Sequence, residues 1–95
     1  MKMLLIVADA ARFDAVREDL GELHAAGYSA LPVLEGAGRT GLHTGDRVHP
    51  GGLVALFVVA ADAEAPALFD SMVARRDAAG DRITRLFLLP VERQA

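Results

Sequence analysis

The residues that could bind a ligand are concentrated in a glycine-rich stretch and in one later turn. Six of the nine glycines of this 95-residue chain lie between positions 36 and 52, and Arg39 stands among them. Glycines let backbone amides approach an anion closely, and an arginine adds positive charge. In the later turn, Gly80 and Arg82 offer the same combination. The predicted anion-binding residues are Gly36, Gly38, Arg39, Thr40, Gly41, Gly80 and Arg82.

The segment from Gly36 to Gly41 also matches the pattern G-x-G-x-x-G. In a dinucleotide-binding domain this pattern follows the first strand and opens a helix directly. Here no helical periodicity begins after Gly41, and Pro50 precedes two glycines that lead into an apolar run. We therefore expect either a flexible turn or an anion-binding loop at this segment, and no Rossmann domain.

Two histidines of the same stretch suggest a second kind of site. His43 and His49 flank Asp46, and two imidazoles with a carboxylate can bind zinc or copper. Solvated loop histidines are the simpler interpretation, because nothing in so glycine-rich a segment fixes their geometry. The chain has no cysteine, so thiolate metal sites and disulfides are excluded. Metal binding through His43 and His49 therefore stays as the alternative to anion binding.

The sequence offers little for catalysis. There is no cysteine nucleophile, and Ser29 and Ser71 lack the context of a nucleophile elbow. The carboxylates are spread over predicted helix surfaces, without a pair at a spacing that suits acid–base chemistry. We therefore expect a binding protein rather than an enzyme.

Charge and hydropathy narrow the partners and the compartment. The formal net charge of −3 gives no general attraction to nucleic acid. No apolar run approaches the roughly 20 residues needed to cross a bilayer, so membrane insertion is not expected. The apolar run after Lys2 is short and is broken by Asp9 and Arg12, which does not suit a secretory signal. These features predict a cytoplasmic protein.

The spacing of apolar residues predicts the elements that position the candidate residues. Apolar runs indicate strands at 3–8, 28–35, 53–60 and 83–89, and spacings of three and four indicate helices at 12–26 and between Asp62 and Gly80. The 28–35 strand is expected at a sheet edge, because Pro32 cannot donate a ladder hydrogen bond. Asp9 and Asp62 are expected to cap the two helices, and Gly80 to end the second.

The order strand, helix, strand, strand, helix, strand predicts an α+β fold of the ferredoxin-like kind. We expect a single domain over residues 1–95, a βαββαβ sandwich whose four-stranded antiparallel sheet carries both helices on one face. The 36–52 stretch is then a loop between two strands. Because the central strands are apolar on both faces, the other face of the sheet needs a cover, and self-association is the simplest one.

Two short stretches resemble the PII-like signalling superfamily, which includes the nitrogen regulatory PII proteins. Glu35-Gly36-Ala37-Gly38-Arg39 follows the second predicted strand, and Gly41-Leu42-His43-Thr44 comes next, as at the base of the PII T-loop. The ending Pro90-Val91-Glu92 after the last strand is also similar. The resemblance implies a homotrimer that binds small anionic effectors, often adenine nucleotides, in clefts between subunits. It also implies that the T-loop signals to a partner protein such as a membrane transporter or a metabolic enzyme.

The chain departs from the PII pattern in two places. The turn at 77–82 keeps only Gly80-Asp81 of a PII motif similar to Thr-Gly-x-x-Gly-Asp-Gly-Lys, and Arg82 could replace its lysine. The loop at 36–52 is also shorter than a T-loop. A divergent PII-like regulator with a short T-loop is the leading hypothesis, with an adenine nucleotide as one candidate effector. A metal-binding or metal-tolerance protein of the same fold is the alternative, and a small enzyme ranks last.

Overall fold

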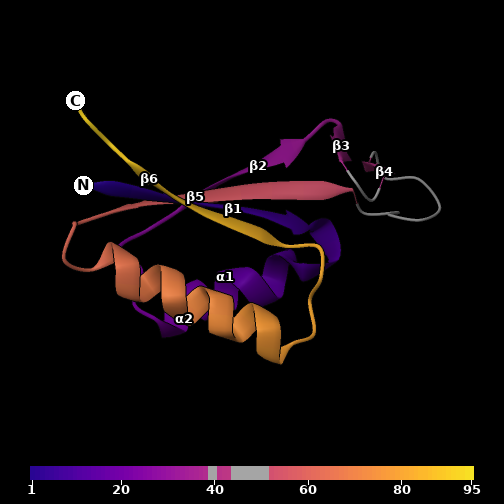
Figure 1. Ribbon diagram of the computed structural model, residues 1–95, viewed down its shortest axis with the longest axis horizontal. Helices are drawn as coiled ribbons and strands as arrows, with labels where there is room; N and C mark the ends of the chain where they lie inside the picture. Colours follow the sequence, from indigo (N-terminus) through magenta and orange to yellow (C-terminus); the bar gives the residue numbers. More distant parts are fainter. Residues whose placement is uncertain (39–40, 44–51) are drawn as a thin grey trace.

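Residues 1–38, 41–43 and 52–95 are described by the computed structural model of the chain. They form a four-stranded antiparallel sheet with two helices against one face (Figure 1). The elements are β1 (Lys2–Asp9), η1 (Ala10–Arg12), α1 (Phe13–Glu22), β2 (Ser29–Val33), β3 (Gly36–Gly38), β4 (Gly41–His43), β5 (Leu53–Ala60), α2 (Ala65–Ala78) and β6 (Arg85–Pro90). The strand order β2-β5-β1-β6 confirms the predicted ferredoxin-like fold.

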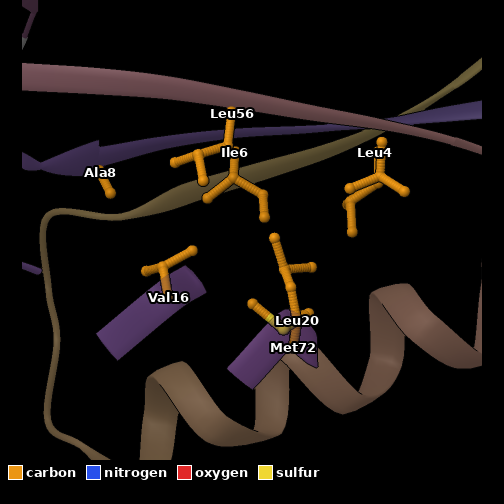
Figure 2. Packing of buried hydrophobic residues seen from close by; sticks show 8 residues of the cluster. Leu4, Ile6, Ala8, Val16, Leu20, Leu56 and Met72 are labelled. Carbon is orange, nitrogen blue, oxygen red and sulfur yellow. The ribbon is translucent and has the colours of Figure 1, made fainter. Parts of the chain in front are cut away.

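The core lies between the two central strands and the two helices. Alternate residues of β1 are buried, because successive side chains of a strand point to opposite faces and one face meets the helices. Figure 2 shows the buried side chains of β1 and β5 facing those of α1 and α2. The buried cluster consists of Leu4, Ile6, Ala8, Val16, Leu20, Leu56, Val58 and Met72. Its residues are the apolar positions from which the strands and helices were predicted.

The first helix is shorter than predicted and ends at an unusual residue. α1 stops at Glu22, and His24 follows in the left-handed region with φ +58°. The amides of His24 and Ala25 donate to the carbonyls of Gly21 and Leu20, which is the Schellman pattern. Glycine usually occupies the left-handed position, because a Cβ is strained there. The apolar spacing runs on to residue 26, so periodicity alone could not locate this helix end.

The predicted helix caps are partly correct. Asp9 accepts a hydrogen bond from Ala11 N at 2.9 Å, so it caps the 3-10 turn η1 that leads into α1. The prediction that Asp62 caps α2 is wrong, since its carboxylate pairs with the N-terminal ammonium of Met1 at 2.8 Å. Gly80 follows the last turn of α2 with φ +69°, as a glycine that ends a helix does.

β2 lies at an edge of the sheet, as Pro32 predicted. Beyond it, β3 and β4 pair as a separate antiparallel hairpin, with Gly36 opposite His43 and Gly38 opposite Gly41. The first part of the predicted 36–52 loop is therefore paired backbone rather than an irregular loop. Short glycine-rich strands show no alternation of apolar residues, so the sequence pattern did not reveal this hairpin.

The face of the sheet opposite the helices is mostly apolar. The register places Leu5 of β1 between Phe57 of β5 and Phe87 of β6, and Phe87 is 48% exposed. No described element covers this face in Figure 1. We call it the open face. Its apolar residues are Met3, Leu5, Val7, Leu31, Val33, Leu53, Ala55, Phe57, Val59, Phe87 and Leu89, and the same face also carries Asp9, Ser29 and Arg85 at strand ends.

Candidate functional site

The turn after α2, residues 80–84, is held in shape by one carboxylate. Asp81 Oδ1 accepts hydrogen bonds from the amides of Ile83 and Thr84, each at 3.0 Å. Its Oδ2 accepts from the Thr84 hydroxyl and from Arg12 Nε, the latter at 3.4 Å. The Asp81 side chain is only 5% exposed. The cavity beside it measures about 10 Å³ and has room for at most one water molecule. Protein groups therefore satisfy this carboxylate.

The surroundings of Asp81 favour its charged form. Burial alone would raise its pKa, but hydrogen bonds from the Thr84 hydroxyl, the Thr84 amide and the Ile83 amide lower it, and so does the charge of Arg12. The resulting pKa lies below the ordinary value of 3.8. Asp81 is thus ionised at neutral pH, and its negative charge fixes the turn.

Arg75, one of four arginines near this turn, is committed to the packing of the helices. Its Nη1 donates to Asp19 Oδ1 at 3.0 Å and also to Glu22, so it ties α2 to α1. The hydrogen bonds to Glu22 and Asp19 raise the pKa of Arg75 above its ordinary value. Arg75 is therefore an interhelical ion-pair residue and is not free to meet a ligand.

Two further arginines bind the carbonyls of the turn itself. Arg85 Nη1 donates to the carbonyls of Arg82, Ile83 and Thr84 at 3.0, 3.4 and 3.2 Å. Arg76 Nη1 donates to the Thr84 carbonyl at 3.5 Å, and its Nε donates to Asp77 at 3.0 Å. Asp81 thus holds the amides of the turn, while these two arginines hold its carbonyls.

Arg82 is the one arginine of this group without a partner among the described residues. Its side chain is exposed, and neither its guanidinium nor its backbone amide makes a hydrogen bond there. The Gly80 amide, by contrast, already donates to the Asp77 carbonyl at 3.0 Å. Gly80 therefore shapes the turn, and the donors that the turn can offer to an anion are the side chain and the amide of Arg82.

The predicted glycine-rich residues lie at the same end of the sheet as this turn. In Figure 1 the β3–β4 hairpin and the chain that leaves α2 are both at the right-hand end of the sheet. Gly36, Gly38 and Gly41 are paired positions of the hairpin. Arg39 and Thr40 connect its two strands and lie outside the described residues, so their part in an anion site stays a prediction.

The metal alternative gains no support from the described part of the chain. His43 is the last residue of β4, opposite Gly36, and His49 lies outside the described residues. Within residues 1–38, 41–43 and 52–95, no three histidine or acidic side chains gather as a metal-binding group. Because His49 lies outside the described residues, a metal site formed by His43 and His49 stays a prediction.

Sequence reasoning missed the two residues that organise this turn. In the sequence, Asp81 stands out only as part of a motif, and Arg12 only as a charged residue that ends the first apolar run where a helix begins. A local signal for Asp81 does exist, since an aspartate often accepts hydrogen bonds from backbone amides two and three residues later. The contact with Arg12 joins positions 69 residues apart, and no local pattern could have shown it.

The comparisons with known proteins identify the family. The family model described as nitrogen regulatory protein P-II matches residues 1–94, so this chain belongs to the P-II family of regulatory proteins. A search of the curated proteins finds no match. No described helix is long and apolar enough to cross a membrane.

Solved structures share the fold at low sequence identity. One is CPII of Thiomonas intermedia K12, a nitrogen regulatory PII-like protein bound to ADP, AMP and bicarbonate. It has a TM-score of 0.68 and 18% identity over 97% of this chain and 88% of that chain. Another is a DUF3240 family protein from Shewanella baltica OS155, with a TM-score of 0.73 and 17% identity over 99% of this chain and 92% of that chain. These likenesses confirm the fold, and the family match over residues 1–94 confirms the predicted resemblance.

Proposed function

We propose that this protein is a homotrimeric PII-like regulator that binds a small anionic effector in the clefts between subunits. It acts in the cytoplasm and signals through the 36–52 segment to a partner protein such as a membrane transporter or a metabolic enzyme. The observation that carries the proposal is the turn at 80–84. That turn is held from both sides by Asp81 and Arg85, yet the Arg82 guanidinium and amide have no hydrogen-bond partner among residues 1–38, 41–43 and 52–95.

A turn that is held by these contacts, and whose Arg82 guanidinium has no partner among the described residues, suits an anion. Because the contacts already restrict the turn, an incoming phosphate or carboxylate has little of it left to order. Each charge-assisted hydrogen bond to such an anion contributes about 1.5–3 kcal/mol. Arg39 and the hairpin amides of a neighbouring subunit complete the proposed cradle. The effector classes to try first are those bound by the Thiomonas protein, namely ADP, AMP and bicarbonate.

The open face supports the trimer. Ten apolar side chains on four strands would stay partly exposed to water in a lone chain, whereas Ala55 of this face is already buried. An exposed apolar patch of this kind marks an interaction surface. A second and a third copy of the same face would cover it. Packing around a three-fold axis would also bring the 80–84 turn of one subunit toward the hairpin of the next.

A thermal-shift screen tests the proposal. Wild type and Arg82→Ala are melted with ADP, AMP, bicarbonate and citrate, and Arg17→Ala serves as the control. Arg17 is also an exposed arginine, and it pairs with Asp14 on α1, outside the turn. A ligand at 100 times its Kd stabilises the wild type by about 2.7 kcal/mol. Arg82→Ala should weaken binding roughly tenfold and remove about 1.4 kcal/mol of that stabilisation.

Two results would contradict the proposal. One is a wild type that none of these anions stabilises. The other is an Arg82→Ala variant that responds to the stabilising anion as fully as the wild type and Arg17→Ala do.

A further inference from the structure

One short turn contacts both the proposed anion site and the end of the glycine-rich stretch. Ala10, the first residue of η1, donates its amide hydrogen to the Gly52 carbonyl at 3.0 Å. Arg12, the last residue of η1, donates from Nε to Asp81. Because η1 has only three residues, its two ends cannot shift independently. The turn at 80–84 and Gly52 are thereby connected within one chain.

Gly52 is a constrained point of the backbone. It is buried, it lies directly before β5, and its φ of +67° falls in the left-handed region. Glycine adopts that region without a steric penalty. The Gly52 carbonyl therefore sets the position from which the preceding stretch enters the sheet, and its hydrogen bond to Ala10 holds that position.

Arg12 has a single ion-pair partner among the described residues, and that partner is Asp81. The contact measures 3.4 Å, against 3.0 Å for each of the two backbone amides that Asp81 binds. A small displacement of Asp81 therefore changes the Arg12 contact before it breaks the turn. Arg12 is one-third exposed, which gives its side chain room to follow.

We propose that η1 transmits the state of the 80–84 turn to Gly52, with Arg12 as the positioning residue between them. The proposal rests on the function proposed above, because it describes how binding at Arg82 reaches the glycine-rich stretch. Two states are involved, with the Ala10–Gly52 hydrogen bond formed or open. An anion shifts their populations only if it favours one arrangement of the turn, and Asp81 passes that arrangement to Arg12.

The test is hydrogen exchange at the Ala10 amide in the full chain, and its first part needs no ligand. Asp81→Asn keeps an acceptor for the turn amides but loses the charge that Arg12 meets. It should speed Ala10 exchange by about fivefold, although residue 81 does not touch Ala10. Arg12→Ala should have the same effect, and the double variant should exchange no faster than either single one, because both changes break one connection.

Two controls separate this effect from general loss of stability. Asp77→Asn makes the same chemical change at an exposed carboxylate whose one ion-pair partner in the described part of the chain is its neighbour Arg76, and it should leave Ala10 exchange unaltered. The Ile6 amide, in a central strand, reports global unfolding. In Asp81→Asn the exchange rate of the Ala10 amide must rise while that of the Ile6 amide stays unchanged. Unchanged Ala10 exchange in Asp81→Asn, equal acceleration of Ala10 and Ile6, or additive effects of the two substitutions would each overturn the inference.

A second part adds ADP with bicarbonate. Binding should alter Ala10 exchange in the wild type by about threefold or more, and Arg12→Ala should bind but lose that response. If ADP binds the wild type and Ala10 exchange does not change, the connection is refuted while the anion site stands. If no anion binds, the proposed function fails, and the first part still decides whether η1 connects the turn to Gly52.

Discussion

Replacing Leu5 by aspartate tests whether the open face is an interface between subunits. Leu5 lies at the centre of this face, with Phe57 on one side and Phe87 on the other. Leu5 is already partly buried in a single chain, so its further burial contributes less than the about 1.5–3 kcal/mol of a fully buried leucine in each of three subunits. Burying the new carboxylates costs several kcal/mol more for each. The association constant of the trimer should fall by at least about 10³-fold.

The assay is light scattering of the purified protein at micromolar concentration, with circular dichroism to verify folding. Leu34→Asp is the matched control, because Leu34 is 92% exposed and lies outside the open face. We expect the wild type and Leu34→Asp to be trimers and Leu5→Asp to be a folded monomer, since its carboxylate would face water once the subunits separate. A wild-type monomer, or a Leu5→Asp variant that stays trimeric, would refute the assignment of the open face.

Three further predictions follow from single residues. His24→Gly should raise the melting temperature by about 2–8 °C through relief of left-handed strain, whereas an equal gain in His24→Ala would exclude that cause. The stability that Asp81 contributes is present above its unfolded pKa of 3.8 and is lost as pH falls through its lower folded pKa. Asp81→Asn should therefore reduce the slope of the unfolding free energy against pH on the acid side. An unchanged slope would count against this contribution of Asp81. If His43 and His49 bind zinc, calorimetry should show affinity that weakens as pH falls through about 6.5, and equal binding by their double alanine variant would end the metal hypothesis.

The fold was predictable because its signals are local. The continuous apolar runs of β1 and β5 could only be central strands, and Pro32 placed β2 at an edge. The helix ends were less predictable. The first helix is closed by His24 in the left-handed backbone conformation, which is usually taken by glycine, so the residue type gave no sign of the helix end. Asp62 was misassigned for a related reason. Its partner is the N-terminal ammonium, which folding brings beside it and no sequence window includes.

The candidate site was predictable only in part. Glycines and arginines drew attention to the turn at 80–84, but the sequence could not say which of Arg75, Arg76, Arg82 and Arg85 has no partner in the fold. That distinction depends on contacts with Asp19 and Glu22 on the other helix and with the carbonyls of the turn itself. Long-range ion pairs of this kind are set by packing, so they become visible only in the folded chain. Among the described residues these contacts leave Arg82 unpaired, and its part in an anion site stays a prediction.

Native mass spectrometry of the purified protein, alone and with ADP and bicarbonate, tests the central claim most directly. It reports subunit number and bound ligand in one spectrum. We predict a mass three times that of the 10.1 kDa chain. At a ligand concentration near the wild-type Kd, we expect up to three bound effector molecules for the wild type and a much smaller bound fraction for Arg82→Ala, because its binding is roughly tenfold weaker. A 10.1 kDa monomer, or a trimer that retains no anion from the screened classes, would contradict the account.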